Sequence, residues 1–200
     1  IRDRYIIPQY FPYFSDFIRQ RIFMTIERLG RTNNAAFVFK ISSMSIAEIG
    51  LKKAICEGNY REYNRDDAKD REEKRKIELA SYDCDFFLTS ANAITEDGVM
   101  VNIDGFANRV SAIAAGPRNV IMIVGMNKVV KDVDDAMSRA RNEAAPINAQ
   151  RFSLDTPCSK AGSCFDCKNP DTICCQILIT RFSKLPKRIK VILVNDELGF

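Results

Sequence analysis

The chain of 200 residues is long enough to bury one sizeable core, and its 46% hydrophobic and 28% charged residues are typical of a single globular domain. Its net charge of +4 is spread along the chain and largely matched by acids, which argues against a nucleic-acid partner. No apolar run approaches the roughly 18 residues of a membrane helix, and the absence of histidine excludes Ser-His-Asp catalysis, Cys-His catalysis and histidine-ligated metal sites.

The beginning of the chain predicts an amphipathic helix. Apolar residues recur at helical spacing between residues 12 and 29, and Gly30 is a suitable stop. We expect this helix to face the core, or alternatively to meet a partner subunit in a homo-oligomer. The chain does not begin with Met and its first residues are not those of a signal peptide, so we expect that its true beginning is missing or processed.

A short buried strand is predicted at residues 35–39, followed by a serine-rich turn and a helix over 46–57. Ser45 and Glu48 have the spacing of a capping box. Ser43 stands in the turn, where a strand that runs into a helix N-terminus can bind an anion. Residues 61–76 mix acids and bases nearly evenly, which predicts a solvated helix.

The segment 89–110 concentrates polar residues between apolar strands. It follows a predicted buried strand at 85–88, and ligands of open α/β sheets bind where strands end. Asp97-Gly98 predicts a tight turn, the alternation beyond it predicts a hairpin or edge strand, and a helix begins at Asn108. Asparagines and Asx-Gly pairs often serve only the local backbone, but the density of polar groups favours a ligand site.

Polar side chains around these strand ends are the candidate ligand-binding residues, namely Ser43, Ser90, Asn92, Thr95, Asn102, Asp104, Asn108 and Arg109. Arg109 offers a bidentate donor for a carboxylate, and the amides of Asn92 and Asn102 complete the grip. Glu96 and Asp97 are the candidate catalytic bases. The alternative for Arg109 is a salt bridge to Asp104 or Glu96 that only pins the hairpin.

The remaining apolar pattern predicts a strand over 120–124, a helix over 132–145 and a last strand over 189–194. Acids in the first turn and arginines near the end of the 132–145 helix agree with its dipole. Glu197 follows the last strand in an acidic turn. The alternation of strands and helices predicts one three-layer α/β domain over residues 1–200, with a mainly parallel sheet.

Residues 155–176 form a cysteine-rich loop with the spacing C-x5-C-x2-C-x6-C-C. Cys158, Cys164, Cys167 and Cys174 offer four thiolates, a set that suits zinc or an iron–sulfur cluster. The alternatives are a redox-labile disulfide between near neighbours and inert thiols. An odd number of cysteines, seven, does not resemble a secreted disulfide framework, so we expect a cytoplasmic location. The two cysteines outside this loop lie in apolar periodic segments and are expected in the core, namely Cys56 and Cys84.

Several motifs resemble, in order, the LUD (lactate utilisation domain) family and especially its short single-domain members related to lactate utilisation protein C, namely SANAITEDGVMVNIDGFANRV, AAPINAQR, TPCSKAGSCFDC and RIKVILVNDELGF. The resemblance covers about residues 44–200 and leaves 1–34 as a divergent N-terminal helical segment. It implies a fold of the NagB/RpiA/CoA-transferase type. It also implies a role in bacterial lactate utilisation, beside iron–sulfur partner proteins that take part in oxidising L-lactate to pyruvate. Family members carry a Gly-Gly-Ser turn where this chain has Ile41-Ser42-Ser43, which puts close approach of a phosphate there in doubt.

Three functional hypotheses follow, of which the third is a purely structural subunit whose cysteine loop is stapled by a metal. In the first, the chain is a subunit in the oxidation of a small 2-hydroxy acid, with Glu96 as base and electrons leaving through a metal centre on the cysteines or in a partner. In the second, it is a non-catalytic module that senses a small acid or a sugar phosphate, with a metal holding the cysteine loop. Asn92 stands where sugar-phosphate isomerases of the same fold class carry an acid, and an amide cannot shuttle a proton, which favours the second hypothesis.

Overall fold

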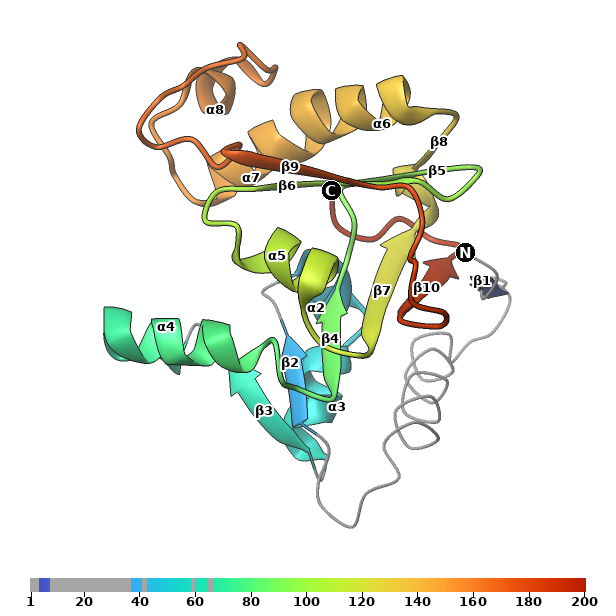
Figure 1. Ribbon diagram of the computed structural model, residues 1–200. Helices are drawn as coiled ribbons and strands as arrows, with labels where there is room; N and C mark the ends of the chain where they lie inside the picture. The colour runs from blue at the N-terminus through green and yellow to red at the C-terminus, as the bar shows by residue number, and fades with distance from the viewer. Residues whose placement is uncertain (1–3, 8–36, 41–42, 59, 65–66) are drawn as a thin grey trace.

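A parallel sheet lies at the centre of the molecule (Figure 1). The structure is a computed structural model that describes residues 4–7, 37–40, 43–58, 60–64 and 67–200. The sheet has six strands, all parallel, in the order β1-β10-β7-β4-β2-β3. Their bounds in chain order are Arg4–Ile7 (β1), Phe37–Lys40 (β2), Arg61–Asn64 (β3), Phe86–Thr89 (β4), Val120–Gly125 (β7) and Ile189–Val194 (β10).

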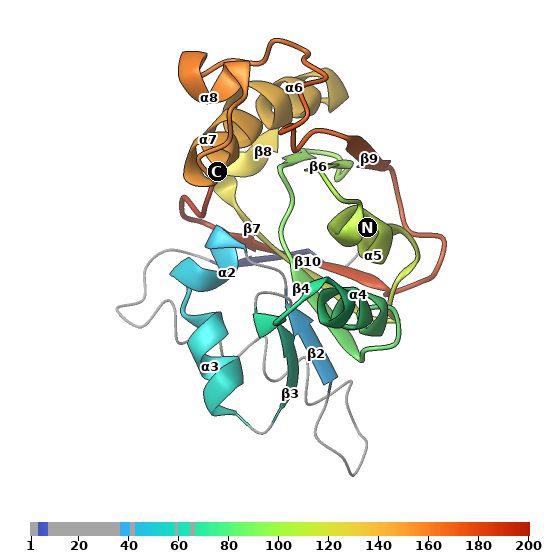
Figure 2. The same cartoon turned by 90° about the vertical axis from the view of Figure 1, so that its left-hand side faces the viewer.

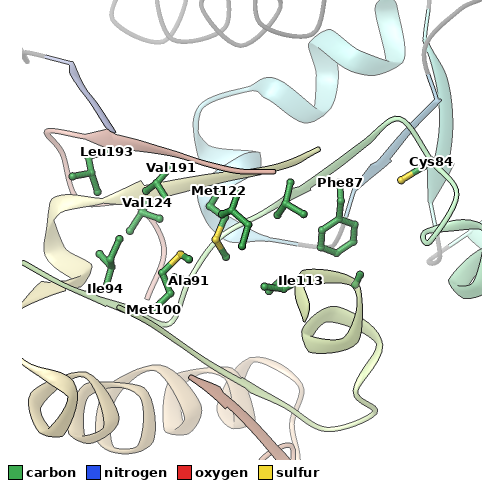
Figure 3. Close-up of a cluster of buried hydrophobic side chains, with 13 residues drawn as sticks. Cys84, Phe87, Ala91, Ile94, Met100, Ile113, Met122, Val124, Val191 and Leu193 are labelled. Atoms are coloured by element: carbon green, nitrogen blue, oxygen red, sulfur yellow. The ribbon is translucent and has the colours of Figure 1, made fainter. Parts of the chain in front are cut away.

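The central strands are apolar on both faces, as a parallel sheet covered on both sides requires. Every residue of β4 and β7 is buried, and β10 has only Lys190 outside the buried class. Successive side chains of these strands point to opposite faces of the sheet and therefore belong to two separate cores. One core lies on the side of the first helices and includes Ile46, Leu51, Ile55, Phe86, Leu88, Ile121, Ile123 and Val194. The other includes Phe87, Ile94, Met100, Ile113, Val120, Met122, Val124, Val191 and Leu193 (Figure 3).

The helix that was expected over 46–57 is in fact two helices, α2 (Met44–Glu48) and α3 (Leu51–Glu57). Gly50 separates them, because its left-handed backbone, with φ at 67°, interrupts the helical path. The capping box was a wrong prediction. α2 begins after Ser43, which makes no side-chain capping bond, and Ser45 lies inside the helix and is buried.

A second sheet of four strands has the order β8-β5-β6-β9. It holds the hairpin predicted around Asp97-Gly98, because β5 (Ala93–Thr95) and β6 (Met100–Asp104) pair antiparallel. The two flanking strands are β8 (Val129–Val130) and β9 (Gln176–Thr180). One face of the sheet adds Ile94 and Met100 to the core beside Met122 and Val124 (Figure 3).

The other face of this second sheet packs against a long helical run. The run consists of α6 (Val133–Arg139), the π-helical turn η3 (Ala140–Ala144) and α7 (Ala145–Arg151), so the expected helix is confirmed and extends further. Pro146 has no N–H for an ordinary helical bond, and the chain widens just before it, where the N–H of Ala145 bonds to the carbonyl of Ala140.

The expectation of a helix over 61–76 was wrong at its start. Residues 61–64 form the edge strand β3, and α4 (Arg71–Ala80) begins after Asp70, whose side chain accepts a hydrogen bond from the N–H of Glu73. Two further helices are α5 (Asn108–Ala115) and α8 (Pro157–Ala161). Cys84 is buried as expected, whereas Cys56 is exposed and donates to Glu62 at 3.0 Å, so its placement in the core was wrong.

The N-terminal segment was expected to be helical, yet residues 4–7 form β1 and pair with β10. The helix expected over 12–29 lies outside the described residues. The parallel sheet between helical layers confirms the three-layer α/β class, while the NagB/RpiA/CoA-transferase type stays an expectation. None of the helices within the described ranges has the length and apolar character to cross a membrane.

Candidate functional site

The six-stranded sheet fixes where a ligand site is to be sought. Because its strands are all parallel, their carboxyl ends share one edge. The strands after β1 occupy the sheet in the order β3-β2-β4-β7-β10, so the direction in which the chain adds strands reverses between β2 and β4. Ligands of open α/β sheets bind beside such a reversal, outside the carboxyl ends. The segments that follow β2, β4 and β7 are therefore the relevant ones.

Lys128 brings these three segments together. It closes the short 3-10 turn η2 (Met126–Lys128) that follows β7, and it is only 3% exposed. Its Nζ donates to the Oγ of Ser45 at 2.9 Å and to the Oγ of Ser90 at 3.4 Å. Ser45 comes from the helix after β2, and Ser90 directly follows β4. One ammonium group is thus shared by three strand ends.

The surroundings of Lys128 are positive. No carboxylate of the described residues lies within salt-bridge distance of its Nζ, and Arg109 and Arg139 are close enough to act on it. Burial, followed by the repulsion of Arg139 and Arg109, lowers the pKa of Lys128 from 10.5 to about 8, while Glu48 acts in the opposite direction. A buried cation without a counter-ion is a feature of sites that bind anions.

Three of the predicted ligand-binding residues do converge. The guanidinium of Arg109 donates to Asn102 Oδ1 at 2.9 Å and to Asn92 Oδ1 at 2.8 Å. It also reaches the carbonyl of Ser90 at 3.2 Å, which joins this group to Lys128. Burial lowers the pKa of Arg109, and the charge of Asp104 opposes that shift. Asn102 is fully buried, and its Nδ2 has no hydrogen-bond partner, so the group holds an unused donor.

Asp104 serves the backbone rather than the Arg109 guanidinium. Its carboxylate accepts hydrogen bonds from the N–H groups of Phe106, Arg109 and Val110 at 3.2, 2.8 and 3.1 Å. These are the amides at the start of α5, where Ala107 occupies the N-cap position without a side chain to cap them. Asp104 therefore positions Arg109 by fixing the first turn of its helix.

The remaining candidates lie apart from Lys128. Thr95 is consumed by the hairpin turn, where its hydroxyl bonds to Asp97 and accepts from the N–H of Val99 at 2.8 Å. Glu96 and Asp97 are exposed at that turn, and the carboxylates that act on Lys128 and Arg109 are those of Glu48 and Asp104 instead. The last two candidates are partly exposed at helix starts, Ser43 before α2 and Asn108 at the first position of α5.

The sequence analysis did not identify Lys128 or Arg139 as site residues, nor the contact of Ser45 with Lys128. Arg139 is 7% exposed and donates to the carbonyls of Asn127, at 2.9 Å, and Asn92. Lys128 carried a usable signal, because it stands just beyond a predicted buried strand, as the 89–110 segment does. Arg139 carried none, because an arginine near the end of an amphipathic helix is accounted for by the helix dipole.

The chain's last residues cross this edge of the sheet. The carbonyl of Leu198 accepts from Ser45 Oγ at 3.1 Å, and the Asn127 amide bonds to both Leu198 N–H and the Gly199 carbonyl. Glu48 accepts from the N–H of Gly199 at 2.6 Å. Glu197 itself is exposed. The C-terminus ends beside α7 (Figure 2).

The four cysteines predicted as metal ligands gather in the loop around α8. The thiols of Cys158, Cys164 and Cys167 are close enough for their charges to act on the Cys174 thiol. Burial is the main cause that raises the pKa of Cys174 to about 11. Within the described part of the chain, no group of three or more His, Cys, Asp or Glu side chains is placed to hold a metal ion, and all seven cysteines are free thiols.

Comparisons with known proteins assign the chain to a family. No curated protein matches the chain. A DUF162 family protein from Deinococcus radiodurans has a solved structure that is 14% identical over 90% of this chain and 98% of that chain, with a TM-score of 0.35. The family model of the LUD domain matches residues 17–194, which begins inside the segment 1–34 that the resemblance had left out. The chain therefore belongs to the LUD domain family, which is associated with lactate utilisation proteins.

Proposed function

We propose that the chain is a lactate-utilisation-type protein that binds a small 2-hydroxy or 2-oxo acid, such as L-lactate or pyruvate, by its carboxylate beside Lys128. The observation that carries the proposal is the buried ammonium of Lys128, held between Ser45 and Ser90, with no carboxylate of the described residues at salt-bridge distance. Membership of the LUD domain family supports the choice of acid.

The energetics favour an anionic ligand. Removing an ammonium group from water costs on the order of several kcal/mol, and here two guanidinium groups add repulsion to that cost. A bound carboxylate would offset both the cost of removing the ammonium group from water and the repulsion by the two guanidinium groups. Its oxygens can accept from Lys128 and from the serine hydroxyls, and the 2-hydroxyl or 2-oxo group of the acid would suit the unused donor of Asn102.

The proposed role is to hold the acid rather than to oxidise it alone. Glu96 and Asp97, the carboxylates expected to act as bases, are exposed at the hairpin turn. In this proposal the electrons of lactate oxidation pass to iron–sulfur partner proteins. A second candidate is a non-catalytic sensor of a sugar phosphate, which the same surplus of positive charge favours.

Calorimetric titration tests the proposal, with L-lactate, pyruvate, inorganic phosphate and a sugar phosphate as ligands. Lys128→Met should weaken binding of the acid at least about tenfold, because a hydrogen bond to a charged group contributes on the order of 1.5–3 kcal/mol. Lys131→Met is the matched control, since it removes the same charge three positions later, at an exposed residue.

The outcomes separate the two candidates. Binding of L-lactate or pyruvate that is lost in Lys128→Met and kept in Lys131→Met supports the proposal. Tighter binding of the sugar phosphate, with the same dependence on Lys128, supports the sensor. Failure of both acids to bind, or equal binding by the two variants, contradicts the proposed function.

A further inference from the structure

We propose that the segment 181–187, between β9 and β10, is a docking surface for an anionic lipid membrane. Its sequence, RFSKLPK, alternates cations with large apolar side chains. Arg181, Lys184 and Lys187 stand three positions apart, and Phe182 and Leu185 each follow one of them. The proposal does not depend on the proposed function, because this segment and the Lys128 site share no residue.

The apolar side chains of the 181–187 segment are largely exposed to solvent. Phe182 is 66% exposed and Leu185 is 63% exposed. In Figure 2 the chain between β9 and β10 runs along the outer margin of the molecule. A single exposed apolar residue is common on protein surfaces, but two of them in one short segment, each flanked by cations, have the composition of a membrane-surface anchor.

The positive charge of the segment is not balanced by acids. Residues 172–195 contain no aspartate or glutamate. No carboxylate of the described residues lies at salt-bridge distance from Arg181, Lys184 or Lys187. Anionic headgroups would supply the missing negative charge, and each cation near such a surface strengthens binding about fivefold.

A fourth cation extends this surface. Arg118 is exposed in the loop before β7, and the N–H of Val120 donates to the carbonyl of Arg188 at 2.9 Å, so the loops that lead into β7 and β10 are adjacent. Two acids, Asp83 and Asp85, precede β4, which β7 separates from β10. The cations therefore gather beside the start of β10.

Hydrogen bonds give the segment a fixed shape. The carbonyl of Leu185 accepts from Ser183 Oγ at 2.8 Å and from the N–H of Arg188 at 3.4 Å. Lys190 Nζ donates to the carbonyl of Lys187 at 2.5 Å. Lys187 has φ at 59°, a left-handed conformation that favours glycine, so the turn itself does not account for a lysine there. A segment that is ordered before it binds loses little conformational freedom on binding.

A lipid surface suits this segment better than a protein partner does. A specific protein interface takes about 20–30 residues from each side, which is more than the 181–187 segment and the neighbouring loop supply. A lipid surface has no fixed shape to be matched. Its headgroups can meet the cations, and the boundary between headgroups and acyl chains can accept the side chains of Phe182 and Leu185.

Cosedimentation of the full chain with phospholipid vesicles tests the proposal. We expect binding to vesicles of equimolar phosphatidylglycerol and phosphatidylcholine, little binding to phosphatidylcholine alone, and weaker binding as added salt screens the charges. Lys184→Gln combined with Lys187→Gln should weaken binding about 25-fold, at about fivefold for each cation. Lys74→Gln combined with Lys76→Gln is the matched control, because it removes the same charge from exposed positions of α4 and should leave binding close to that of the wild type.

A single tryptophan can report entry of the segment into the membrane, because the chain contains none. The fluorescence of Phe182→Trp should shift to shorter wavelength when the phosphatidylglycerol vesicles are added, since the indole ring leaves water. Leu79→Trp places the same reporter at a position of α4 that is 51% exposed, and its fluorescence should not shift.

Four results would overturn the membrane surface. One is the absence of binding to the phosphatidylglycerol vesicles at low salt, which would leave an acidic protein as the occupant that the charges fit. Another is equal weakening by the two pairs of lysine substitutions, which would assign binding to the net charge of the chain. The third is fluorescence of Phe182→Trp that does not shift, or that shifts no more than that of Leu79→Trp. The fourth is a dimer, formed without vesicles, that Leu185→Ala dissociates, which would assign the segment to a contact between two copies of the chain.

Discussion

Lys128 Nζ lies 2.9 Å from Ser45 Oγ, although 83 positions separate the two residues in the chain. The contact exists because β2 and β7 run in the same direction, so the segments that follow them meet at one edge of the sheet. The hydroxyl of Ser45 also donates to the carbonyl of Leu198, beyond β10, at 3.1 Å. A single serine therefore connects three strand ends around the buried ammonium group.

The first prediction concerns what Lys128 does to stability. At neutral pH the buried ammonium opposes folding, and Ser45 and Ser90 keep other partners if it is removed. Lys128→Met should therefore be at least as stable as the wild type at pH 7, although it binds the acid more weakly. Urea unfolding measures the difference. A loss of several kcal/mol in this variant would instead assign Lys128 a structural role.

The pH dependence of that difference has a definite sign. The pKa of Lys128 is about 8 in the folded chain and 10.5 ordinarily, so the unfolded chain binds more protons between these values. The stability of the wild type should rise relative to Lys128→Met from pH 8 to pH 10.5, by an amount on the order of 3 kcal/mol. Below pH 8 the difference should be constant.

Binding of the acid should depend on pH in the opposite direction. Lys128 loses its charge as the pH rises through about 8, so the affinity for L-lactate or pyruvate should fall above that value. A bound carboxylate stabilises the ammonium form, and binding near pH 8 should therefore take up a fraction of a proton. Titrations in buffers of different ionisation enthalpy measure this uptake. Affinity that is constant up to pH 10 would contradict a contact with Lys128.

The central strands could be predicted because one physical cause, burial on both faces of the sheet, determines their sequence. The runs of β7 and β10 are apolar at nearly every position, which only a strand covered on both sides requires. By contrast β3, with the residues Arg61, Glu62, Tyr63 and Asn64, pairs on one side only and carries charge as edge strands do, so its charges resembled a solvated helix.

The site was predictable only where its residues are neighbours in sequence. Asn92, Asn102 and Arg109 lie within one hairpin and the helix after it, and their density at a strand end indicated their convergence. Lys128 is one of 30 lysines and arginines, and only the pairing of strands distant in sequence shows that it is buried. Arg139 contacts Asn92 from 47 positions away, which no local pattern encodes.

The C-terminal residues should influence binding through Ser45. Gly199 has φ at 56°, and a Cβ added there would lie 2.9 Å from Ser45 Oγ and 3.2 Å from Ser45 N. Gly199→Ala should therefore displace Ser45 or the last residues and weaken binding of the acid. Gly162→Ala is a matched control, because Gly162 has φ at 75° but no atom within 4 Å of such a Cβ.

Both alanine variants share the left-handed strain of roughly 1–2 kcal/mol, so stability alone cannot distinguish them. The affinity for the acid distinguishes them, since only Gly199→Ala disturbs Ser45, a hydrogen-bond partner of Lys128. Calorimetry of the two variants measures the ratio of their affinities. If the two affinities are equal, the C-terminal residues have no part in the site.

The last prediction is that Arg188 contributes to stability and not to binding of the acid, because it lies at the edge of the sheet opposite to Lys128. Arg188 precedes β10 and is 7% exposed, and its guanidinium donates to the carbonyls of Ala112, Ile113 and Pro117 at 3.0, 2.6 and 3.0 Å. The Ile113 and Pro117 carbonyls stand at and beyond the end of α5, where helical partners run out, whereas the Ala112 carbonyl also accepts from the N–H of Gly116. Burial lowers the pKa of Arg188.

Arg188→Met should cost on the order of 3 kcal/mol, because it leaves the buried carbonyls of Ile113 and Pro117 without their donor and removes one of the two donors to Ala112. Arg181→Met, at an exposed position, should change stability by less than about 0.5 kcal/mol. Urea unfolding measures both. The affinity of folded Arg188→Met for the acid should equal that of the wild type, because Arg188 lies at the amino edge of β10 and Lys128 lies at the carboxyl edge of the same sheet. Binding that falls in proportion to stability would mean that the two edges are coupled.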